Sequence, residues 1–352
     1  MFNDKSLSKD IVFSSLLVFI LPVALITGPA VPDIILSIVA TFFLVQSFLK
    51  KLWFYYYNPL VIFVALFCLY GITRSLFSDL PLYSLSNEGS VFYFRYIFFV
   101  LCVWYLLDKN PYFSKCLIII VIISLLTVTV DGLVQYFFDT NSFGNSKHSN
   151  YRLTGLFGDE PVIGRYISYM SIFSFFLIYQ NFAPTKKTVI FSILILMISE
   201  IVTFLTGERA ALFYLILFSI LVIIFFQNLR IYRIAGFLLS VLILTFLVFI
   251  NSSAKTRMVD FTISQISETK YPFLPYSEHH ERIYFTSFKM FLDKPITGIG
   301  TNLYKYKCSE EKFFYKKNSC STHPHNYYIQ SLAELGIIGF IFLISFYTFI
   351  LF

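Results

Sequence analysis

Charged residues are scarce in this chain: they make up 13% of its 352 residues, whereas 57% are hydrophobic. Soluble domains carry roughly 25% charged residues, so most of the surface of this protein does not face water. The sequence also lacks an internal repeat, a low-complexity tract and an appended soluble domain. These absences exclude a water-soluble globular protein and indicate a protein that lies mainly in a membrane.

Several motifs are missing as well. No GxxxxGK[ST] phosphate loop occurs, which excludes an ATP-hydrolysing engine within the chain. The formal net charge of +7 is not gathered into a basic block interleaved with aromatic residues, so nucleic acid is not an expected partner. The first apolar stretch follows Lys5 and Lys9 but has no A-x-A-like cleavage site, and this predicts an uncleaved first span. GIG at 298–300 lacks the third glycine of a dinucleotide fingerprint and indicates a turn.

Long apolar runs are abundant and define the fold class. A run of about 20 apolar residues spans the hydrocarbon of a bilayer as a helix. The sequence therefore predicts an all-α, polytopic transmembrane protein with about ten spans. These lie near 11–27, 32–49, 59–77, 91–107, 116–138, 162–182, 188–205, 208–227, 233–250 and 336–352. The 44 Phe and 25 Tyr suit lipid-facing helices and aromatic belts at the interfaces.

The distribution of Lys and Arg predicts the orientation, because these residues favour cytoplasmic loops. With a cytoplasmic N-terminus, the inner loops hold Lys5, Lys9, Lys50, Lys51, Lys109, Lys115, Lys186, Lys187, Arg230 and Arg233. Each predicted cytoplasmic segment then contains a pair of Lys or Arg residues. We expect the N-terminus in the cytoplasm and the larger polar loops on the opposite face.

The domain organisation follows from these spans. Residues 1–250 form a helical region of about nine spans, and 251–326 form a large extracytoplasmic loop containing short helices. Within the loop, residues 280–295 have apolar side chains at roughly helical spacing, which predicts a surface helix. Residues 327–352 form an interfacial segment and a last span. That span ends at Phe352 without a polar flank, so we expect a truncated chain.

Six arginines fall on the predicted outer face, against the usual charge bias. They are Arg74, Arg95, Arg152, Arg165, Arg209 and Arg282. Guanidinium groups recognise phosphate oxygens in a bidentate manner, so the cluster predicts a polyanionic ligand. The alternative is that each arginine pairs with a nearby carboxylate or extends to the membrane interface.

Histidines and two cysteines also fall on that face. His323 and His325 stand where the large loop enters the last span, and His is the natural proton acceptor near neutral pH. No Cys or carboxylate cluster accompanies them at ligand spacing, so a metal is not expected. Cys308 and Cys320 are twelve residues apart in polar sequence, where an oxidising compartment favours a disulfide over free thiols.

The segment THPHNYYIQSLAELGIIG at 322–339 resembles the signature of the O-antigen ligase and O-antigen polymerase family of bacterial inner membranes. His325 and Asn326, followed after nine residues by Gly336, match its H-N-x9-G spacing. Three further blocks resemble the family in the same order: YRLTGLFGDEPVIG at 151–164, TGERAAL at 206–212 and RIYFTSFKMFLDKPITGIG at 282–300. The resemblance covers about 150–350.

This resemblance implies an inverting, metal-independent glycosyltransferase without cofactors, located in the bacterial inner membrane with its catalytic face in the periplasm. It would transfer a glycan from polyprenyl pyrophosphate to a hydroxyl of lipid A core or of a growing O-antigen chain. His325 would be the general base, and Arg209 and Arg282 would hold the pyrophosphate. Arg74, Arg95 and Arg152 are assigned to donor binding only from their predicted position near the outer face of the membrane.

Two other functions stay open. Related members of the family glycosylate proteins, and sequence alone does not separate this protein O-oligosaccharyltransferase activity from ligation or polymerisation. A transporter of lipid-linked oligosaccharides would also need outward arginines and many spans. Such a transporter usually has repeat symmetry and charge deep in the bilayer, which this sequence does not display.

Overall fold

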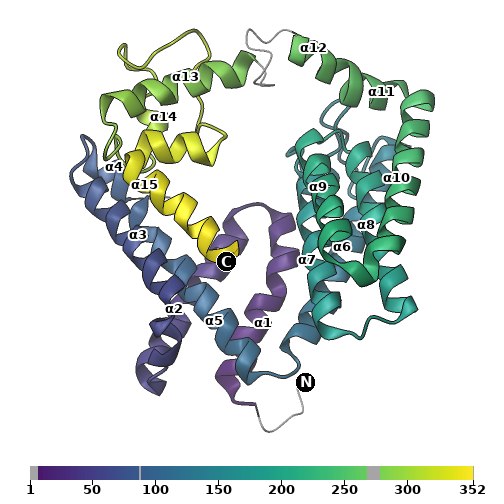
Figure 1. The fold of residues 1–352 in the computed structure, drawn as a ribbon, viewed down its shortest axis with the longest axis horizontal. Coiled ribbons are helices and arrows are strands. Elements are labelled where there is room, and N and C mark those ends of the chain that lie inside the picture. The colour runs from purple at the N-terminus through teal and green to yellow at the C-terminus, as the bar shows by residue number, and fades with distance from the viewer. Residues whose placement is uncertain (1–6, 87–88, 268–277, 352) are drawn as a thin grey trace. The chain divides into compact units, whose positions relative to one another are not determined.

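The computed structural model describes residues 7–86, 89–267 and 278–351 (Figure 1). These residues are mainly helical and contain no β-strand, only the isolated bridges Thr140–Ser146 and Ser149–Arg152. The predicted all-α class is therefore confirmed. Lys5, residues 268–277 of the predicted loop and Phe352 lie outside the described residues.

Ten long helices coincide with the ten predicted spans. They are α1 (Lys9–Ala24), α2 (Ala30–Lys50), α3 (Pro59–Leu76), α5 (Phe94–Lys109), α6 (Phe113–Phe138), α7 (Ile163–Asn181), α8 (Lys186–Leu205), α9 (Arg209–Phe225), α10 (Arg230–Ile250) and α15 (Tyr327–Leu351). The remaining helices are α4 (Pro81–Leu85), α11 (Ser252–Lys255), α12 (Phe261–Ser267), α13 (Glu278–Asp293) and α14 (Tyr304–Lys307).

Eight helical segments of the described chain are long and apolar enough to cross a membrane. The apolar helix α9 is shorter than these, and α7 is not among them. The protein thus has the character of a multi-pass membrane protein, while the number of ten spans stays a prediction.

Local sequence explains where individual helices begin. Asn58 precedes α3, and its side-chain oxygen accepts a hydrogen bond from the Leu60 amide, while Pro59 occupies the first helical position. Thr185 caps α8 in the same way, accepting from the Thr188 amide at 3.3 Å. Such caps satisfy amide groups that have no partner inside the helix.

The chain divides into two compact units. Unit 1 contains the chain up to Ile35 together with Leu106–Ile263, and unit 2 contains Leu36–Tyr105 together with the chain from Ser264 onward. Each unit is described by itself below.

Unit 1 is a helical bundle in which α7 packs against α6, α8 and α9, and α10 packs against α8 and α9 (Figure 1). An apolar core forms between these helices. Its buried members are Phe175, Val189, Ile193, Leu196, Met197, Phe218, Val222 and Leu229. Gly236 of α10 permits close packing on α8, because a Cβ there would lie 2.6 Å from the Ile193 side chain.

A buried polar cluster joins three helices of the same bundle. Arg233 of α10 donates hydrogen bonds to the Glu200 carboxylate of α8 and to the Ser219 hydroxyl of α9. Arg233 is fully buried and Glu200 is 1% exposed. The sequence assigned Arg233 to a cytoplasmic loop, and that interpretation was wrong: its guanidinium lies inside the bundle because Glu200 provides the opposite charge.

Unit 2 is built around α15. Helix α3 and helix α13 both pack against α15, and the segment from α13 to residue 320 has its own small core. Its buried members are Ile283, Met290, Ile299, Leu303, Tyr304, Cys308, Phe313 and Ala333. Ala333 belongs to α15, so we call residues 278–320 the cap of unit 2 and infer that the cap is seated on this helix.

The predicted surface helix exists as α13, and only part of its apolar pattern is buried. Ile283 and Met290 are buried, whereas Phe288 and Leu292 are 50% and 60% exposed. The small residues between them explain the difference: Thr286 and Ser287 allow the close approach of α13, and their positions fix which side faces the core.

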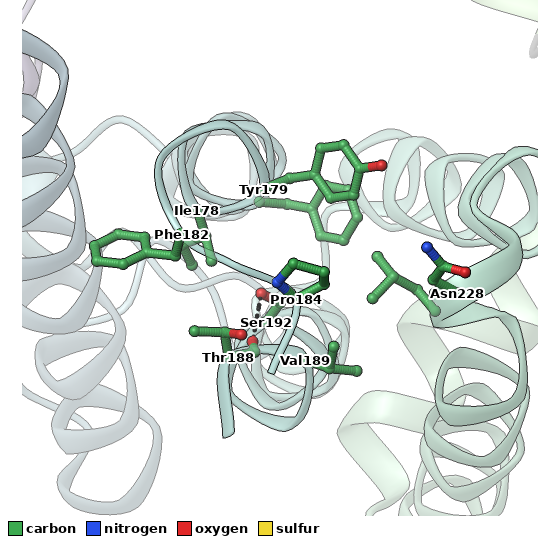
Figure 2. Close-up of a pocket in the computed structure, with 10 residues that line it drawn as sticks. Ile178, Tyr179, Phe182, Pro184, Thr188, Val189, Ser192 and Asn228 are labelled. Atoms are coloured by element: carbon green, nitrogen blue, oxygen red, sulfur yellow. Dashed lines mark hydrogen bonds between the residues drawn. The ribbon is translucent and has the colours of Figure 1, made fainter. Parts of the chain in front are cut away.

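An apolar pocket lies at one end of unit 1, where the α7–α8 connection meets the α9–α10 connection (Figure 2). Its volume is about 220 Å³, and Tyr179, Phe182, Thr188 and Asn228 are among its lining residues. Figure 2 shows the Ser192 hydroxyl bonded to the Thr188 carbonyl, at 2.9 Å. None of the ten lining side chains is charged, so this pocket is not a candidate for anion binding.

Candidate functional site

Three arginines of unit 1 lie within electrostatic reach of one another, and we call Arg152, Arg209 and Arg257 the arginine cluster. Arg152 lies on the loop after α6, Arg209 begins α9, and Arg257 lies in the π-helical turn Thr256–Asp260. Burial lowers the pKa of Arg257, and the positive charges of Arg209 and Arg152 lower it further. Mutual repulsion of this kind favours an anionic ligand between the guanidinium groups.

The protein groups that hold these arginines are mostly uncharged. Arg152 donates from Nη2 to the Pro161 carbonyl at 3.0 Å. Arg209 donates from Nη1 to the Thr262 hydroxyl at 3.0 Å. Arg257 donates from Nε to the Gly207 carbonyl at 3.2 Å. Each contact orients a guanidinium group without cancelling its charge.

Glu208 is a carboxylate that interacts with the cluster. Its Oε1 accepts a hydrogen bond from the Gly164 amide at 2.6 Å. Burial raises the pKa of Glu208 despite the opposing effects of the Gly164 bond and of Arg152 and Arg165. Glu208 thus places a buried carboxyl group within electrostatic reach of Arg152 and Arg165.

The turn at Thr206 and Gly207 brings the loop after α6 against the start of α9. Leu153 donates its amide hydrogen bond to the Thr206 carbonyl at 3.3 Å. Gly207 has φ +75°, and a Cβ there would lie 2.2 Å from the Tyr151 carbonyl oxygen. Only glycine fits this position. The two sequence blocks YRLTGLFGDEPVIG and TGERAAL are thus adjacent in the fold.

In unit 2, His325 lies in the turn immediately before α15. Its φ is +56°, a left-handed conformation that is uncommon for residues other than glycine. Its Nε2 lies 3.0 Å from the Ser321 hydroxyl. The ring of His323 is 4.1 Å away and that of His280, on α13, is 5.9 Å away, measured between ring centroids. Uncommon backbone conformations cluster at functional sites.

Asn326, the asparagine of the H-N motif, has a structural role at the start of α15. Its Oδ1 accepts hydrogen bonds from the amides of Tyr328, at 3.0 Å, and Ile329, at 3.3 Å. Asn326 is therefore the N-cap of α15. This cap fixes where α15 begins, and so it holds His325 in the turn beside it.

Arg282 lies on α13, and both terminal nitrogens of its guanidinium group donate hydrogen bonds. Its Nη2 donates to Glu278 Oε1 at 2.5 Å, and its Nη1 donates to the Lys317 carbonyl at 2.9 Å. The Arg282 charge lowers the pKa of Glu278, which is exposed. A ligand phosphate would have to compete with this i, i+4 pair, which is weak at an exposed site.

Arg74 and Arg95 are also held by uncharged groups. Arg74 is 7% exposed and donates from Nε to the Gly298 carbonyl at 2.8 Å and from Nη1 to the Phe77 carbonyl at 2.7 Å. The Arg95 guanidinium carbon lies 5.2 Å from the centre of the Tyr96 ring, and its Nη1 is 3.3 Å from the Ser37 hydroxyl. The contacts of Arg74 indicate a role in holding the backbone.

That backbone contact is part of a close junction between residues 295–300 and the middle of α15, which we call the glycine clasp. The amides of Ile299 and Gly300 donate to the carbonyls of Ala333 and Glu334, at 3.0 and 2.9 Å. The Ile337 amide donates to the Pro295 carbonyl at 2.9 Å. The GIG sequence is therefore a packing feature of the glycine clasp.

Both sides of the glycine clasp need glycine. Gly298 has φ +70°, and a Cβ there would lie 2.3 Å from the Glu334 backbone. Gly336 has φ +67°, and a Cβ there would lie 2.3 Å from the Ile296 carbonyl oxygen. Gly336 also kinks α15, separating the segment that follows His325 from the apolar remainder of the helix. This explains why the H-N-x9-G motif ends in glycine.

Cys308 and Cys320 are neighbours within the cap, with Cα atoms 5.3 Å apart. This separation lies in the range of disulfide bonds. Among the described residues, no group of three or more His, Cys, Asp or Glu side chains is arranged to hold a metal ion.

The six predicted arginines and His325 are thus divided between the units. Unit 1 contains Arg152, Arg165 and Arg209, and unit 2 contains Arg74, Arg95, Arg282 and His325. Sequence reasoning missed Arg257, because nothing in the segment AKTRMVD separates this arginine from the cations around it. Its proximity to Arg152 and Arg209 arises only from the fold.

Comparison with known proteins bears on these residues. Residues 190–344 match the family described as O-antigen ligase. The match includes Arg209, Arg257, Arg282 and His325, and the block at 151–164 lies outside it. No curated protein and no solved structure matches the chain. With this match over part of its length and its apolar helices, the chain is a membrane protein with a region similar to the O-antigen ligase family.

Proposed function

We propose that this protein transfers a glycan from a polyprenyl pyrophosphate to a hydroxyl group during assembly of a surface polysaccharide, with His325 as general base. The observation that carries the proposal is the geometry at His325. The Ser321 hydroxyl lies 3.0 Å from Nε2, and this contact supports an alcohol as the partner of this nitrogen. The left-handed turn and the Asn326 cap define the backbone from which the imidazole projects.

In the proposed reaction, His325 accepts the proton of the acceptor hydroxyl as its oxygen attacks the anomeric carbon of the donor. A new carbon–oxygen bond forms on one face, and the bond to the pyrophosphate breaks on the other, so the configuration inverts. The electron pair of that bond leaves with the polyprenyl pyrophosphate. Neither ATP nor a metal takes part, because the phosphoanhydride donor is already activated.

The arginine cluster supports the donor half of the proposal. A leaving pyrophosphate gains negative charge in the transition state, and preoriented guanidinium groups stabilise such charge. Arg152 and Arg209 are assigned to this role, together with Arg257 from the same cluster. Arg282 is also assigned to pyrophosphate binding. A phosphate oxygen would replace Glu278 as the partner of its guanidinium group. Arg74 and Arg95 are weaker candidates, because they are assigned from their predicted depth in the membrane alone.

The acceptor defines the activity within the family. We propose lipid A core or a growing O-antigen chain as acceptor, in a bacterial inner membrane with the catalytic face in the periplasm. Glycosylation of a protein is the alternative within the family, and transport of the lipid-linked oligosaccharide is the alternative outside it.

The test is the exchange His325→Ala in the native host, with His323→Ala, two residues earlier in the same loop, as the matched control. We expect His325→Ala to abolish transfer and His323→Ala to retain most of it. Surface glycans separated by length identify the reaction: loss of all long chains on the core indicates ligation, whereas single repeats on the core indicate polymerisation. Normal glycans in the His325→Ala strain contradict the proposed catalytic role.

A further inference from the structure

A pocket of about 320 Å³ in unit 1 adjoins the arginine cluster, because Arg257 belongs to both. Known small-molecule sites occupy roughly 300 to 1,000 Å³, so this pocket has room for a small ligand and not for a polymer. Its other lining residues include Tyr136, Lys147, Asn150, Tyr151 and Asn251.

The pocket walls combine aromatic rings with side-chain amides. The Tyr151 ring packs edge-on against Phe261, with 5.6 Å between ring centres, and is itself 36% exposed. Asn251, another lining residue, donates a hydrogen bond from Nδ2 to the Tyr136 hydroxyl. Its side-chain oxygen accepts a hydrogen bond from the Ala254 amide at 2.9 Å. These bonds hold the polar groups in fixed positions. A sugar presents apolar C–H faces to aromatic rings and hydroxyls to amides, and this wall provides partners for both.

The charges of the pocket restrict the ligand further. Lys147 is paired with Asp139 at 2.5 Å and donates to the Tyr136 carbonyl at 3.0 Å, so its charge is already offset. Arg257 has no carboxylate partner among the described residues. Only its Nε is used, in the bond to the Gly207 carbonyl. Arg257 is thus the lining residue whose charge is coupled to those of Arg152 and Arg209.

We propose that this pocket binds the first sugar of a glycosyl pyrophosphate, with Arg257 contacting the phosphate to which that sugar is attached. The inference rests on the proposed function, since it assumes a polyprenyl pyrophosphate donor. It adds the site that recognises the sugar and assigns Tyr151 as a specificity residue. A phospholipid head group shares the phosphate but not the sugar, so it would use the arginine cluster and leave the pocket walls unused.

The experiment measures binding by the full chain in nanodiscs of phosphatidylcholine. The probes are undecaprenyl pyrophosphate and the lipid-linked glycan extracted from the native host, with phosphatidylglycerol as the second phosphate source. We expect wild-type protein to bind the glycosylated lipid at least tenfold more tightly than bare undecaprenyl pyrophosphate. Tyr151→Ala should remove this difference and change the affinity for the bare lipid less than twofold. Arg257→Gln should weaken both by about tenfold.

The control is Tyr179→Ala, an aromatic exchange in the apolar pocket of Figure 2, which should leave both affinities unchanged. Equal affinities of wild-type protein for the two lipids, or an unaltered difference in Tyr151→Ala, would overturn the inference. Competition by phosphatidylglycerol as strong as that by undecaprenyl pyrophosphate would assign the cluster to membrane phospholipid and also overturn it. Binding is read without turnover, so loss of transfer in the His325→Ala test is a separate result.

Discussion

At the scale of single residues, Asp79 connects the α3–α4 turn to the cap of unit 2. Its Oδ1 lies 2.8 Å from the Lys294 ammonium, and its Oδ2 accepts a hydrogen bond from Lys307. The Lys307 side chain is only 4% exposed, so Asp79 supplies the negative charge that this buried cation needs. Hydrogen bonds from Lys294 and Lys307 lower the pKa of Asp79 well below its usual range.

The depressed pKa of Asp79 predicts an acid-sensitive cap. The stabilisation is fully present above the pKa of Asp in the unfolded chain, about 4, and is lost as the pH falls through the lower folded value. Because Asp79 is 46% exposed, we expect Asp79→Asn to cost about 1 kcal/mol of stability at pH 7. Thermal unfolding of both proteins between pH 7 and pH 3 checks this, and a constant gap between them at every pH would contradict it.

The proximity of Cys308 and Cys320 predicts a disulfide that stabilises the cap. Closing a loop of this length contributes about 2–4 kcal/mol. A reducing agent should therefore lower the unfolding temperature of the wild-type protein. Peptide mapping without reduction should recover the linked pair, and the double variant Cys308→Ser/Cys320→Ser should no longer respond to the reducing agent. A wild-type protein that is equally insensitive contradicts the predicted bond.

At the scale of helices, the glycine clasp connects the family motif to the chain it contacts. We expect Gly298→Ala and Gly336→Ala each to destabilise the protein by about 2–4 kcal/mol, because the new Cβ meets backbone and the left-handed φ adds strain. Gly144→Ala is the matched control: its φ is +84°, but no atom lies within 4 Å of its added Cβ. It should cost about 1 kcal/mol. Unfolding of the purified variants measures the difference, and equal losses would contradict the clasp.

In unit 1, the buried pair of Glu200 and Arg233 connects α8 to α10. Removing one partner leaves an uncompensated buried charge, so Arg233→Met should destabilise the bundle by about 3–5 kcal/mol. Adding Glu200→Leu should recover most of that loss, because both charges are then absent. A double-mutant cycle in nanodiscs measures the coupling. Strictly additive losses would exclude a direct interaction between the two side chains.

The helices were predictable from sequence to a greater extent than their contacts. Each apolar run coincides with a helix, because the length and hydropathy of a run are local properties. The buried face of α13 could not be read from the sequence, since Ile283 and Phe288 look equivalent in a helical pattern but only Ile283 is buried. The bond from Arg74 to Gly298 joins residues 224 positions apart, and depth in a span gave no indication of it. Contacts of that kind are set by tertiary packing.

At the scale of the whole molecule, membrane orientation decides which face the arginine cluster occupies. The positive-inside bias predicts that the α7–α8 turn, with Lys186 and Lys187, lies in the cytoplasm. The arginine cluster belongs to the loops at the other ends of α8 and α10, so the same orientation predicts it on the outside. A lipid-linked donor used in surface polysaccharide assembly would be consumed on that outer face. Orientation therefore tests the proposed function independently of any variant of the site.

Two cysteine substitutions test the orientation, both at exposed positions of unit 1. We expect Asn145→Cys, in the loop after α6, to react with a membrane-impermeant maleimide in intact cells. Lys187→Cys should react only after the membrane is opened, because its turn is predicted to face the cytoplasm. The wild-type protein supplies the background: Cys68 and Cys102 are buried, and any labelling of the half-buried Cys116 is subtracted. The reverse pattern would place the arginine cluster in the cytoplasm, where a periplasmic transfer reaction could not use it.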